Sequence, residues 1–288
     1  MLTLKIGNMD FIEKPKIEEL MDHKRRPPKS YKNEEFLNSP EARTVRILSE
    51  YLDPADKFRR NNITDTIAFF GSARIKPKDQ VMAEIEAFKN DDKAGEGELR
   101  QLHRELESSK YYEEAVELAR LTGEYLLSKT TGDKGYAIVT GGGPGIMEAA
   151  NKGATISGCK SVGLTISLPK EESMNDYVID ELGFEFHYFF MRKFWFAYLA
   201  KAVVIFPGGF GTLDEMFEIL TLIQTKKMTK DMKIILYGSD FWNDLINFDK
   251  LIDLGTISPK DVDIFEVHDS PEDAFNSLKE YLENRLHS

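Results

Sequence analysis

The chain has 288 residues, of which 41% are hydrophobic and 30% are charged, proportions typical of a soluble globular protein with a substantial core. Its 38 Lys and Arg residues against 49 Asp and Glu residues give a net charge of -11, which would repel a nucleic-acid backbone and disfavours nucleic-acid binding. The single cysteine, Cys159, excludes an internal disulfide, and the five histidines are too scattered to suggest a metal site.

The amino-terminal region shows no sign of a targeting segment. Residues 1–16 contain several charged side chains and no sustained apolar stretch, unlike a secretory signal. The longest apolar candidate, Phe194–Phe206, is interrupted by Lys201 and is too short to span a bilayer. We therefore expect a cytoplasmic protein without a membrane partner.

Residues 1–62 are expected to form a helical or extended appendage, and residues 63–288 a nucleotide-binding domain. The run Asp22–Lys29 is polar, basic and broken by prolines, and we interpret it as a solvated tail because such charge runs commonly stay hydrated. Residues Pro40–Leu52 have helical spacing. Ordered structure is expected to strengthen near Ile63.

The first strand is predicted at Ile67–Ser72, an apolar run that ends at a turn. Between Lys76 and Lys129 the sequence is mostly helical with a charged break at 90–97, and a helical insertion is expected at about 76–110. The later helix carries an apolar stripe, which could cover the core or make a subunit contact. The stripe consists of Tyr112, Ala115, Leu118, Ala119, Tyr125 and Leu126.

Beyond Gly135, apolar strands alternate with helices. This pattern predicts an α/β fold with a doubly wound, mainly parallel, Rossmann-like sheet and helices on both faces. The expected strands are Tyr136–Thr140, Ser161–Ser167, Glu185–Phe189, Ala202–Phe206, Lys233–Tyr237 and Ile264–Val267. The expected helices are Pro144–Ser157, Met191–Ala200, Leu213–Lys226, about Phe241–Leu254, and Pro271–Arg285.

Two glycine-rich turns, Gly141–Gly145 and Pro207–Thr212, each follow an apolar strand and open a helix. Such turns aim backbone N–H groups and a helix dipole at one point, so they predict a phosphate site; the alternative is two tight turns that bind nothing. A dinucleotide fits poorly, because Ile146 replaces the third small residue of that fingerprint and no acidic ribose partner follows the next strand. Neither turn has the Lys-Ser/Thr of a phosphate-loop nucleotidase, so a mononucleotide phosphate fits better.

The segments Gly141–Ala150 and Pro207–Glu215, the second with the full pattern PGGxGTxxE, resemble the Lonely-guy family. The resemblance runs from about Ile67 to Leu254, and the longer amino-terminal region is similar to the larger bacterial branch. Members are often labelled lysine decarboxylases, but the resemblance implies a phosphoribohydrolase, which cleaves a nucleoside 5′-monophosphate into free base and ribose 5-phosphate. It also implies a homodimer or larger homo-oligomer. The implied substrates are purine nucleotides such as AMP or a cytokinin riboside monophosphate, and we expect no cofactor and no metal.

By the same resemblance, Glu215 and Arg192 are catalytic. Cleavage of an N-glycosidic bond builds positive charge on the ribose and negative charge on the base. We expect Glu215 to stabilise the ribose cation and position the attacking water, while Arg192 orients the nucleotide and stabilises the negative charge. Residues Thr212–Glu215 also spell a capping box, in which Glu215 would only satisfy backbone donors at the helix start.

The phosphate is expected on the backbone of the second turn and the Thr212 hydroxyl, with the first turn on the ribose side, because glycine permits close approach and positive φ. The predicted substrate-binding residues are Gly71, Ser72, Gly141, Gly142, Gly143, Gly145, Glu148, Glu172 (or Glu171), Lys193, Gly208, Gly209, Gly211, Thr212 and Thr221. The family pattern MHxRK is altered at Phe189 and Phe190, which leaves the base preference open. We interpret Phe190 as a core side chain, with stacking on a purine as the alternative.

Two further functions stay open. The chain could be a non-catalytic nucleotide or molybdenum-cofactor carrier, or a structural subunit whose pocket is vestigial. Retention of both Arg192 and Glu215 favours an enzyme. The choice between adenine and N6-modified adenine depends on the width of an apolar pocket, which the sequence does not specify.

Overall fold

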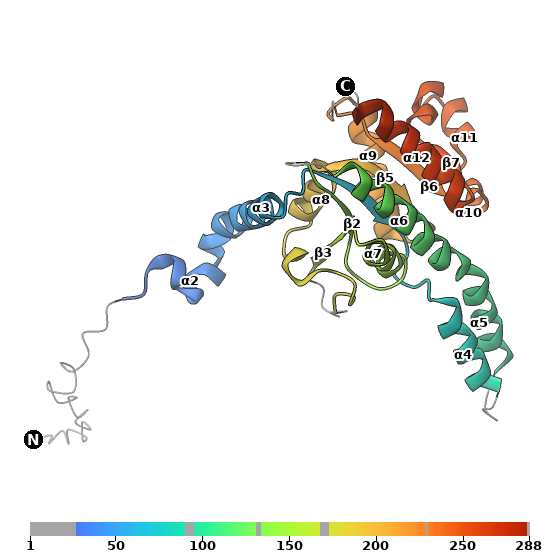
Figure 1. Cartoon of the computed structure of the whole chain (residues 1–288), viewed down its shortest axis with the longest axis horizontal. Coiled ribbons are helices and arrows are strands. Elements are labelled where there is room, and N and C mark those ends of the chain that lie inside the picture. The colour runs from blue at the N-terminus through green and yellow to red at the C-terminus, as the bar shows by residue number, and fades with distance from the viewer. Residues whose placement is uncertain (1–26, 90–94, 131–133, 168–172, 229, 287–288) are drawn as a thin grey trace, which may run out of the picture. The chain divides into compact units, whose positions relative to one another are not determined.

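The structure, a computed structural model, describes residues 27–89, 95–130, 134–167, 173–228 and 230–286 (Figure 1). Its contacts divide the chain into two units, Met1–Arg46 and Ile47–Ser288. The division falls inside helix α3 (Arg43–Arg60), earlier in the chain than the boundary expected after residue 62. Most of the basic run Asp22–Lys29 lies outside the described residues.

The described part of the first unit consists of short helical turns. Helix α2 (Glu34–Asn38) begins where Oδ1 of Asn33 accepts a hydrogen bond from the N–H of Phe36 at 3.3 Å. Nη1 of Arg46 donates to the carbonyl oxygens of Leu37 and Ser39, at 2.6 and 2.7 Å. These bonds satisfy carbonyl groups at the end of α2, where helical partners run out.

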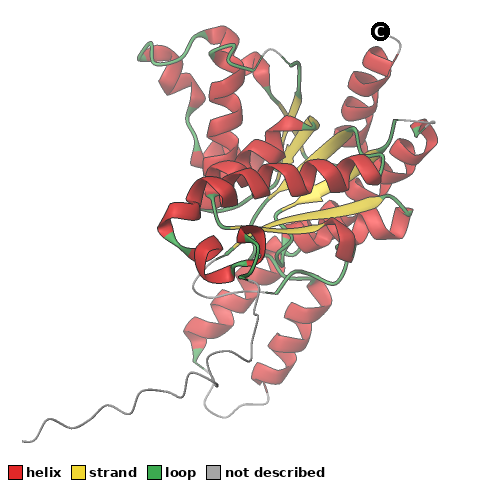
Figure 2. Cartoon of the chain, turned by 90° about the vertical axis from the view of Figure 1, so that its left-hand side faces the viewer, coloured by secondary structure: helices red, strands yellow, loops and turns green. Residues whose placement is uncertain are grey.

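A seven-stranded, all-parallel sheet forms the centre of the second unit, with the strand order β4-β3-β2-β1-β5-β6-β7. This topology, with helices on both faces (Figure 2), confirms the predicted α/β fold. The strands are β1 (Asp65–Phe70), β2 (Tyr136–Thr140), β3 (Lys160–Ile166), β4 (Gly183–Phe186), β5 (Ala200–Ile205), β6 (Lys233–Tyr237) and β7 (Glu266–His268).

Each face of the sheet packs against its own set of helices. Because successive strand residues point to opposite faces, Ile67 and Phe69 of β1 join the core beneath α6, α7 and α12, whereas Ala68 and Phe70 join the core beneath α3, α8, α9 and α10. The helices are α6 (Lys110–Lys129), α7 (Ile146–Ser157), α12 (Pro271–Leu286), α8 (Phe189–Tyr198), α9 (Phe210–Gln224) and α10 (Ser239–Leu245).

The apolar stripe of α6 is buried within the chain. Leu118 and Ala119 are fully buried, and the stripe packs with residues of α7 in the core of that face. Of the two alternatives left open for this stripe, the structure confirms that it covers the core and excludes a subunit contact, because the chain itself covers these side chains. The helical insertion expected at about 76–110 consists of α4 (Lys78–Lys89) and α5 (Glu96–Ser108).

Strand β1 lies where the connections that follow neighbouring strands go to opposite faces of the sheet. Strands β2 and β5 both pair with β1, and the chain leaves β1 toward α6 on one face but leaves β5 toward α9 on the other. Beyond the carboxyl ends of such strands the connections separate and leave a crevice, which is where open α/β sheets bind ligands.

Two predicted boundaries differ from the structure for visible reasons. Strand β4 ends at Phe186, because the N–H groups of His187 and Tyr188 donate to the Glu50 carboxylate, at 2.9 and 3.3 Å, and α8 begins at Phe189. The single helix expected near Phe241–Leu254 is two helices, α10 and α11 (Phe248–Asp253). Asn247 separates them, since its side chain caps α11 by accepting from the N–H of Lys250 at 2.8 Å.

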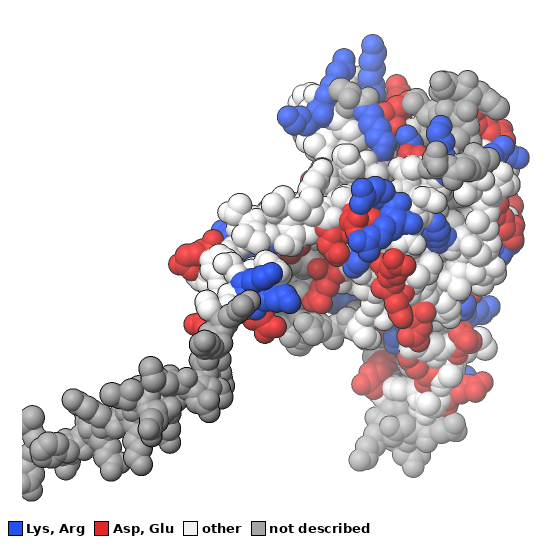
Figure 3. Space-filling view, turned by 60° about the vertical axis from the view of Figure 1, so that its left-hand side comes forward, with Lys and Arg blue, Asp and Glu red and all other residues white. Residues whose placement is uncertain are grey.

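The surface carries charges of both signs. Lys and Arg side chains lie among Asp and Glu side chains on the face that Figure 3 shows. None of the described helices has the length and apolar character needed to cross a bilayer. Within the same described ranges, no cluster of three or more His, Cys, Asp or Glu side chains could hold a metal ion.

Candidate active site

A cavity of about 740 Å³ lies where β1, β2 and β5 end. Three loops line it: Gly71–Arg74 after β1, Gly141 after β2, and Gly208–Thr212 after β5. Arg192 of α8 and Glu215 of α9 also line this cavity. The structure thus brings both predicted catalytic residues together with part of each predicted glycine turn.

The loop after β1 joins the two glycine turns. The N–H of Ser72 donates to the carbonyl oxygen of Pro207 at 3.0 Å, and the N–H of Ile146 donates to the carbonyl oxygen of Ser72 at 3.1 Å. A Cβ atom on Gly71 would lie 2.6 Å from the Cβ of Ile146, so glycine is needed there for α7 to approach. Ser72 is therefore a backbone connector as well as a lining residue.

The second glycine turn forms the amino-terminal end of α9. The helix begins at Phe210 with Gly209 as its N-cap, and a Cβ atom on Gly209 or Gly211 would meet nothing within 4 Å. A Cβ atom on Gly208 would lie 2.1 Å from Oγ1 of Thr212. The N–H groups of Phe210, Gly211 and Thr212 have no acceptor in the preceding turn of the helix and form a ready anion site.

This helix start rules out the capping-box interpretation of Glu215. Thr212 is the third residue of α9, and no side-chain cap is present at Gly209. Glu215 therefore lies in the second turn, where it cannot serve the backbone donors of the helix end. Its side chain is free for chemistry in the cavity.

Glu215 is buried, with an exposed fraction of 8%. Burial raises the pKa of its carboxyl to about 7, although the positive charges of Lys193 and Arg192 act in the opposite direction. A carboxyl with a pKa near neutrality can exchange protons at physiological pH, which is the property of a general acid or base.

Arg192 lies in the same cavity with an incompletely satisfied guanidinium group. Its Nε is buried and has no hydrogen-bond partner among the described residues. Cζ lies 5.4 Å from the ring centroid of Phe196, and Nη2 would lie 3.0 Å from a Cβ atom on Gly141. Burial lowers the pKa of Arg192, and the charge of Glu215 opposes that shift.

Lys193 does not line the cavity, and its predicted role in substrate binding stays a prediction. Its Nζ pairs with Oδ2 of Asp214 at 2.7 Å and with Oε2 of Glu218 at 2.5 Å. Lys193 therefore ties α8 to α9 on either side of Glu215. Of these two neighbouring cations, Arg192 lines the cavity and Lys193 joins the two helices.

Most of the first glycine turn is structural. Gly142 and Gly145 have φ angles of +74° and +70°, which favour glycine, and Nδ2 of Asn175 donates to the carbonyl oxygens of Gly142 and Gly143 at 3.0 and 2.9 Å. Of the turn's glycines, only Gly141 is among the residues that line the main cavity. The role of the other glycines of this turn on the ribose side stays a prediction.

Two other predicted residues lie outside the cavity lining, and one lies outside the described residues. Glu148 accepts a hydrogen bond from the Tyr112 hydroxyl at 2.7 Å and lines two smaller cavities. Thr221 is exposed along α9 and lies outside the lining. Glu172, together with its alternative Glu171, lies outside the described residues.

Sequence reasoning missed several lining residues. Arg74 follows β1, and an apolar part of the lining comes from Met147, Phe189, Phe210, Phe241 and Leu245. Phe241 and Leu245 lie one turn apart on α10, a spacing that signals a shared helix face. Phe190 is 51% exposed, so its interpretation as a core side chain was wrong; its neighbour Phe189 lines the cavity instead.

Comparisons with known proteins find one matching family model and several similar proteins. A family model described as "Possible lysine decarboxylase" matches residues 147–278. The chain is 34% identical over 91 residues to "Cytokinin riboside 5′-monophosphate phosphoribohydrolase LOG7" of Arabidopsis thaliana, covering 31% of this chain and 42% of that protein. It is 26% identical over 163 residues to "Probable cytokinin riboside 5′-monophosphate phosphoribohydrolase LOGL3" of Oryza sativa subsp. japonica, covering 54% of this chain and 74% of that protein. The match thus spans less than half the length of the Arabidopsis relative.

Among solved structures, the molybdenum cofactor carrier protein of Chlamydomonas reinhardtii aligns with a TM-score of 0.45 and 18% identity. The alignment covers 77% of this chain and 99% of that one.

Proposed function

We propose that this chain, whose similarity to the family model and to the plant relatives supports membership in the Lonely-guy family, is a nucleoside 5′-monophosphate phosphoribohydrolase of the larger bacterial branch. The reaction breaks the bond between C1′ of the ribose and a nitrogen of the base. The electron pair of that bond leaves with the base, a water oxygen bonds to C1′, and the proton that this water loses is finally taken up by the base. The products are the free base and ribose 5-phosphate.

One observation carries the proposal. A buried carboxyl with a pKa of about 7 (Glu215) and a half-buried arginine (Arg192), whose buried Nε has no partner among the described residues, line the same cavity as the first turn of α9. Its volume of about 740 Å³ falls in the range of roughly 300–1,000 Å³ occupied by small-molecule sites. Leaving a buried guanidinium short of acceptors is costly, and a bound nucleotide would supply them.

The residues can be assigned roles from their positions. The backbone N–H groups of Phe210, Gly211 and Thr212 hold the phosphate at the positive end of α9. Ionised Glu215 stabilises the positive charge that develops on the ribose and accepts a proton from the attacking water. Arg192 orients the nucleotide and stabilises the negative charge on the departing base.

The test is chromatography of reactions with a panel of purine and pyrimidine nucleoside 5′-monophosphates, including N6-modified adenosine monophosphates. We expect free base and ribose 5-phosphate in equal amounts. Glu215→Gln and Arg192→Ala should each lower kcat/KM by at least about 100-fold. Glu107→Gln makes the same chemical change as Glu215→Gln at an exposed position of α5 and should leave turnover unchanged.

The carrier function predicts a different result. A nucleotide would then raise the melting temperature but would be recovered intact after long incubation. That outcome, or full activity in Glu215→Gln, would contradict the proposed hydrolase.

A further inference from the structure

Arg74 is a charged residue that lines the main cavity, and the proposed cleavage reaction gives it no role. It follows β1, is exposed, and lines both the main cavity and a second cavity of about 410 Å³ beside α4, α5 and the first glycine turn. Within the described part of the chain, its guanidinium group makes no hydrogen bond or ion pair. Arg74 is thus a cation at the cavity that forms no ion pair with any described acidic side chain.

The other charges of the cavity are accounted for. Arg192 and Glu215 act on each other electrostatically, and Asp214 is paired with Lys193 at 2.7 Å. A phosphate monoester carries roughly −1.5 to −2 charges at pH 7, while the amino-terminal end of a helix supplies only about half a positive charge. Arg74 is the remaining lining residue that can balance the difference.

The backbone around Arg74 is fixed on both sides. On one side, its N–H donates to Oγ of Ser72 at 3.1 Å, and Ser72 is bonded to both glycine turns. On the other side, Nζ of Lys76 pairs with Oε2 of Glu84 in α4 at 2.7 Å and with Oε2 of Glu105 in α5 at 3.0 Å.

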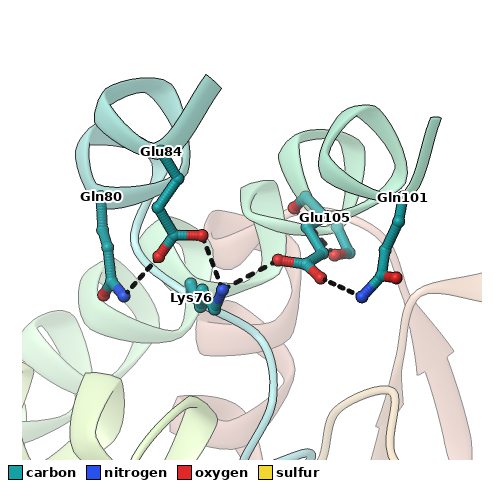
Figure 4. Close-up of polar contacts among 6 residues, drawn as sticks. Lys76, Gln80, Glu84, Gln101 and Glu105 are labelled. Atoms are coloured by element: carbon teal, nitrogen blue, oxygen red, sulfur yellow. Dashed lines mark hydrogen bonds and ion pairs between the residues drawn. The ribbon is translucent and has the colours of Figure 1, made fainter. Parts of the chain in front are cut away.

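Figure 4 shows how the Lys76 contact is supported. Lys76 lies between the two carboxylates, and Gln80 and Gln101 each donate a further hydrogen bond to one of them, at 2.9 Å. A loop held at both ends loses little entropy when its arginine binds an anion.

We propose that Arg74 binds the 5′-phosphate of the substrate beside the first turn of α9, an inference that rests on the proposed nucleotide function of this cavity. The planar guanidinium can donate two parallel hydrogen bonds to phosphate oxygens, which a lysine cannot reproduce. Arg74 contributes to binding of the phosphate and takes no part in cleavage of the distant N-glycosidic bond.

The experiment compares the full-length protein with Arg74→Gln, Arg74→Lys and Arg104→Gln. Arg104 is exposed on α5 and lies outside the cavity, so Arg104→Gln removes the same charge elsewhere. Binding of ribose 5-phosphate is measured by calorimetry, and KM and kcat are measured for a nucleoside 5′-monophosphate that the wild type cleaves. Both measurements are repeated with the nucleoside that lacks the phosphate.

We expect Arg74→Gln to weaken ribose 5-phosphate binding and to raise KM by about tenfold or more, with kcat nearly unchanged. Arg74→Lys should be intermediate, Arg104→Gln should match the wild type, and any response to the nucleoside should be the same in all four proteins. If Arg74→Gln binds ribose 5-phosphate as the wild type does, or if the wild type does not bind it, the proposal is overturned. If no protein cleaves any nucleotide but Arg74→Gln still loses ribose 5-phosphate binding, the hydrolase fails and the role of Arg74 stands.

Discussion

At the scale of single residues, the site holds two buried charges that the protein does not satisfy. Within the described ranges, the Glu215 carboxylate makes no hydrogen bond or ion pair, and Nε of Arg192 has no partner. Burying an ionised group without compensating bonds costs free energy. The raised pKa of Glu215 reflects that cost, because burial disfavours the ionised carboxylate.

Replacing Glu215 by Gln should therefore stabilise the fold while it abolishes cleavage. At 1.36 kcal/mol for each pKa unit, raising the carboxyl pKa from 4.5 to about 7 makes the folded state on the order of 3 kcal/mol less stable at pH 8. The folded state binds the proton more tightly than the unfolded state, so stability falls as pH rises from about 4.5 to 7 and is constant above.

Urea unfolding at a series of pH values checks this prediction. Glu215→Gln should exceed the wild type in free energy of unfolding at pH 8, and the gain should shrink steadily toward pH 5. Glu107→Gln should show no such gain. Equal pH dependence of Glu215→Gln and the wild type would mean that the carboxyl is not destabilised by burial.

Individual site residues could be predicted where a sequence motif specifies their chemistry. They could not be predicted where their role depends on contacts with side chains or loops far away in the sequence. The pattern PGGxGTxxE placed Gly208, Gly211 and Glu215, and all three line the cavity. The ion pairs of Lys193 could not be predicted, because its partners belong to another helix and spacing along the chain does not reveal that contact. Arg74 belongs to no phosphate motif, and its position depends on how the loop after β1 meets the other two.

At the scale of elements, the contact between α8 and α9 holds Arg192 and Glu215, the proposed catalytic pair. Lys193 of α8 joins Asp214 and Glu218 of α9, which lie on either side of Glu215. The positive charge of Lys193 also lowers the pKa of Glu215, whereas Glu218 and Asp214 raise it. The same ion pairs thus position the carboxyl and adjust its acidity.

Lys193→Met should shift the pH profile of cleavage. Removing the cation leaves Glu215 facing two unpaired carboxylates, so its pKa rises and the ascending limb of kcat/KM, which reports ionised Glu215, moves to higher pH. Activity should fall several-fold at pH 6.5 and much less at pH 9. Lys193→Arg should restore a profile close to that of the wild type.

A matched control removes a lysine elsewhere. Lys89→Met, at the exposed end of α4, should leave the profile where it is. A uniform loss of activity at all pH values in Lys193→Met would show that Lys193 only holds the helices together, without setting the acidity of Glu215.

Element type was more predictable than element length. Strands β2 and β6 match their predicted bounds, because a strand buried on both faces is a continuous apolar run. Helix α9 begins at Phe210, three residues before its predicted start. Because glycine has a low helix propensity, Gly209 and Gly211 made the sequence of this first turn typical of a loop. That shift excludes the capping role of Glu215 and leaves its proposed catalytic role.

At the scale of the whole molecule, the sheet order explains why distant segments form one site. Strand β1 pairs with both β2 and β5, so its loop can bond to the turns that follow both neighbours. Alternating strands and helices predict a parallel sheet from sequence. They do not specify that β1 lies between β2 and β5, and the placement of Arg74 depends on this order.

The division of the chain into two units predicts how much of the amino-terminal region the fold needs. Within the second unit, the Phe58 ring lies 5.2 Å from that of Phe184 and 5.3 Å from that of Trp195, measured between centroids. Nε1 of Trp195 donates to the carbonyl oxygen of Glu50 at 2.9 Å. Residues 47–62 thus pack on α8, the helix that carries Arg192.

A chain that begins at Arg43 keeps α3 whole and should retain both cooperative unfolding and nucleotide cleavage. A chain that begins at Ile63, the boundary expected from sequence, loses the buried Phe58 ring and the Glu50 contacts. It should be at least about 3 kcal/mol less stable, the usual cost of removing a core phenylalanine, and its kcat/KM should fall because the start of α8 loses its carboxylate partner. Urea unfolding and steady-state kinetics on both chains decide the matter: if the shorter chain equals the longer one in both, residues 47–62 belong to the appendage and not to the core of the second unit.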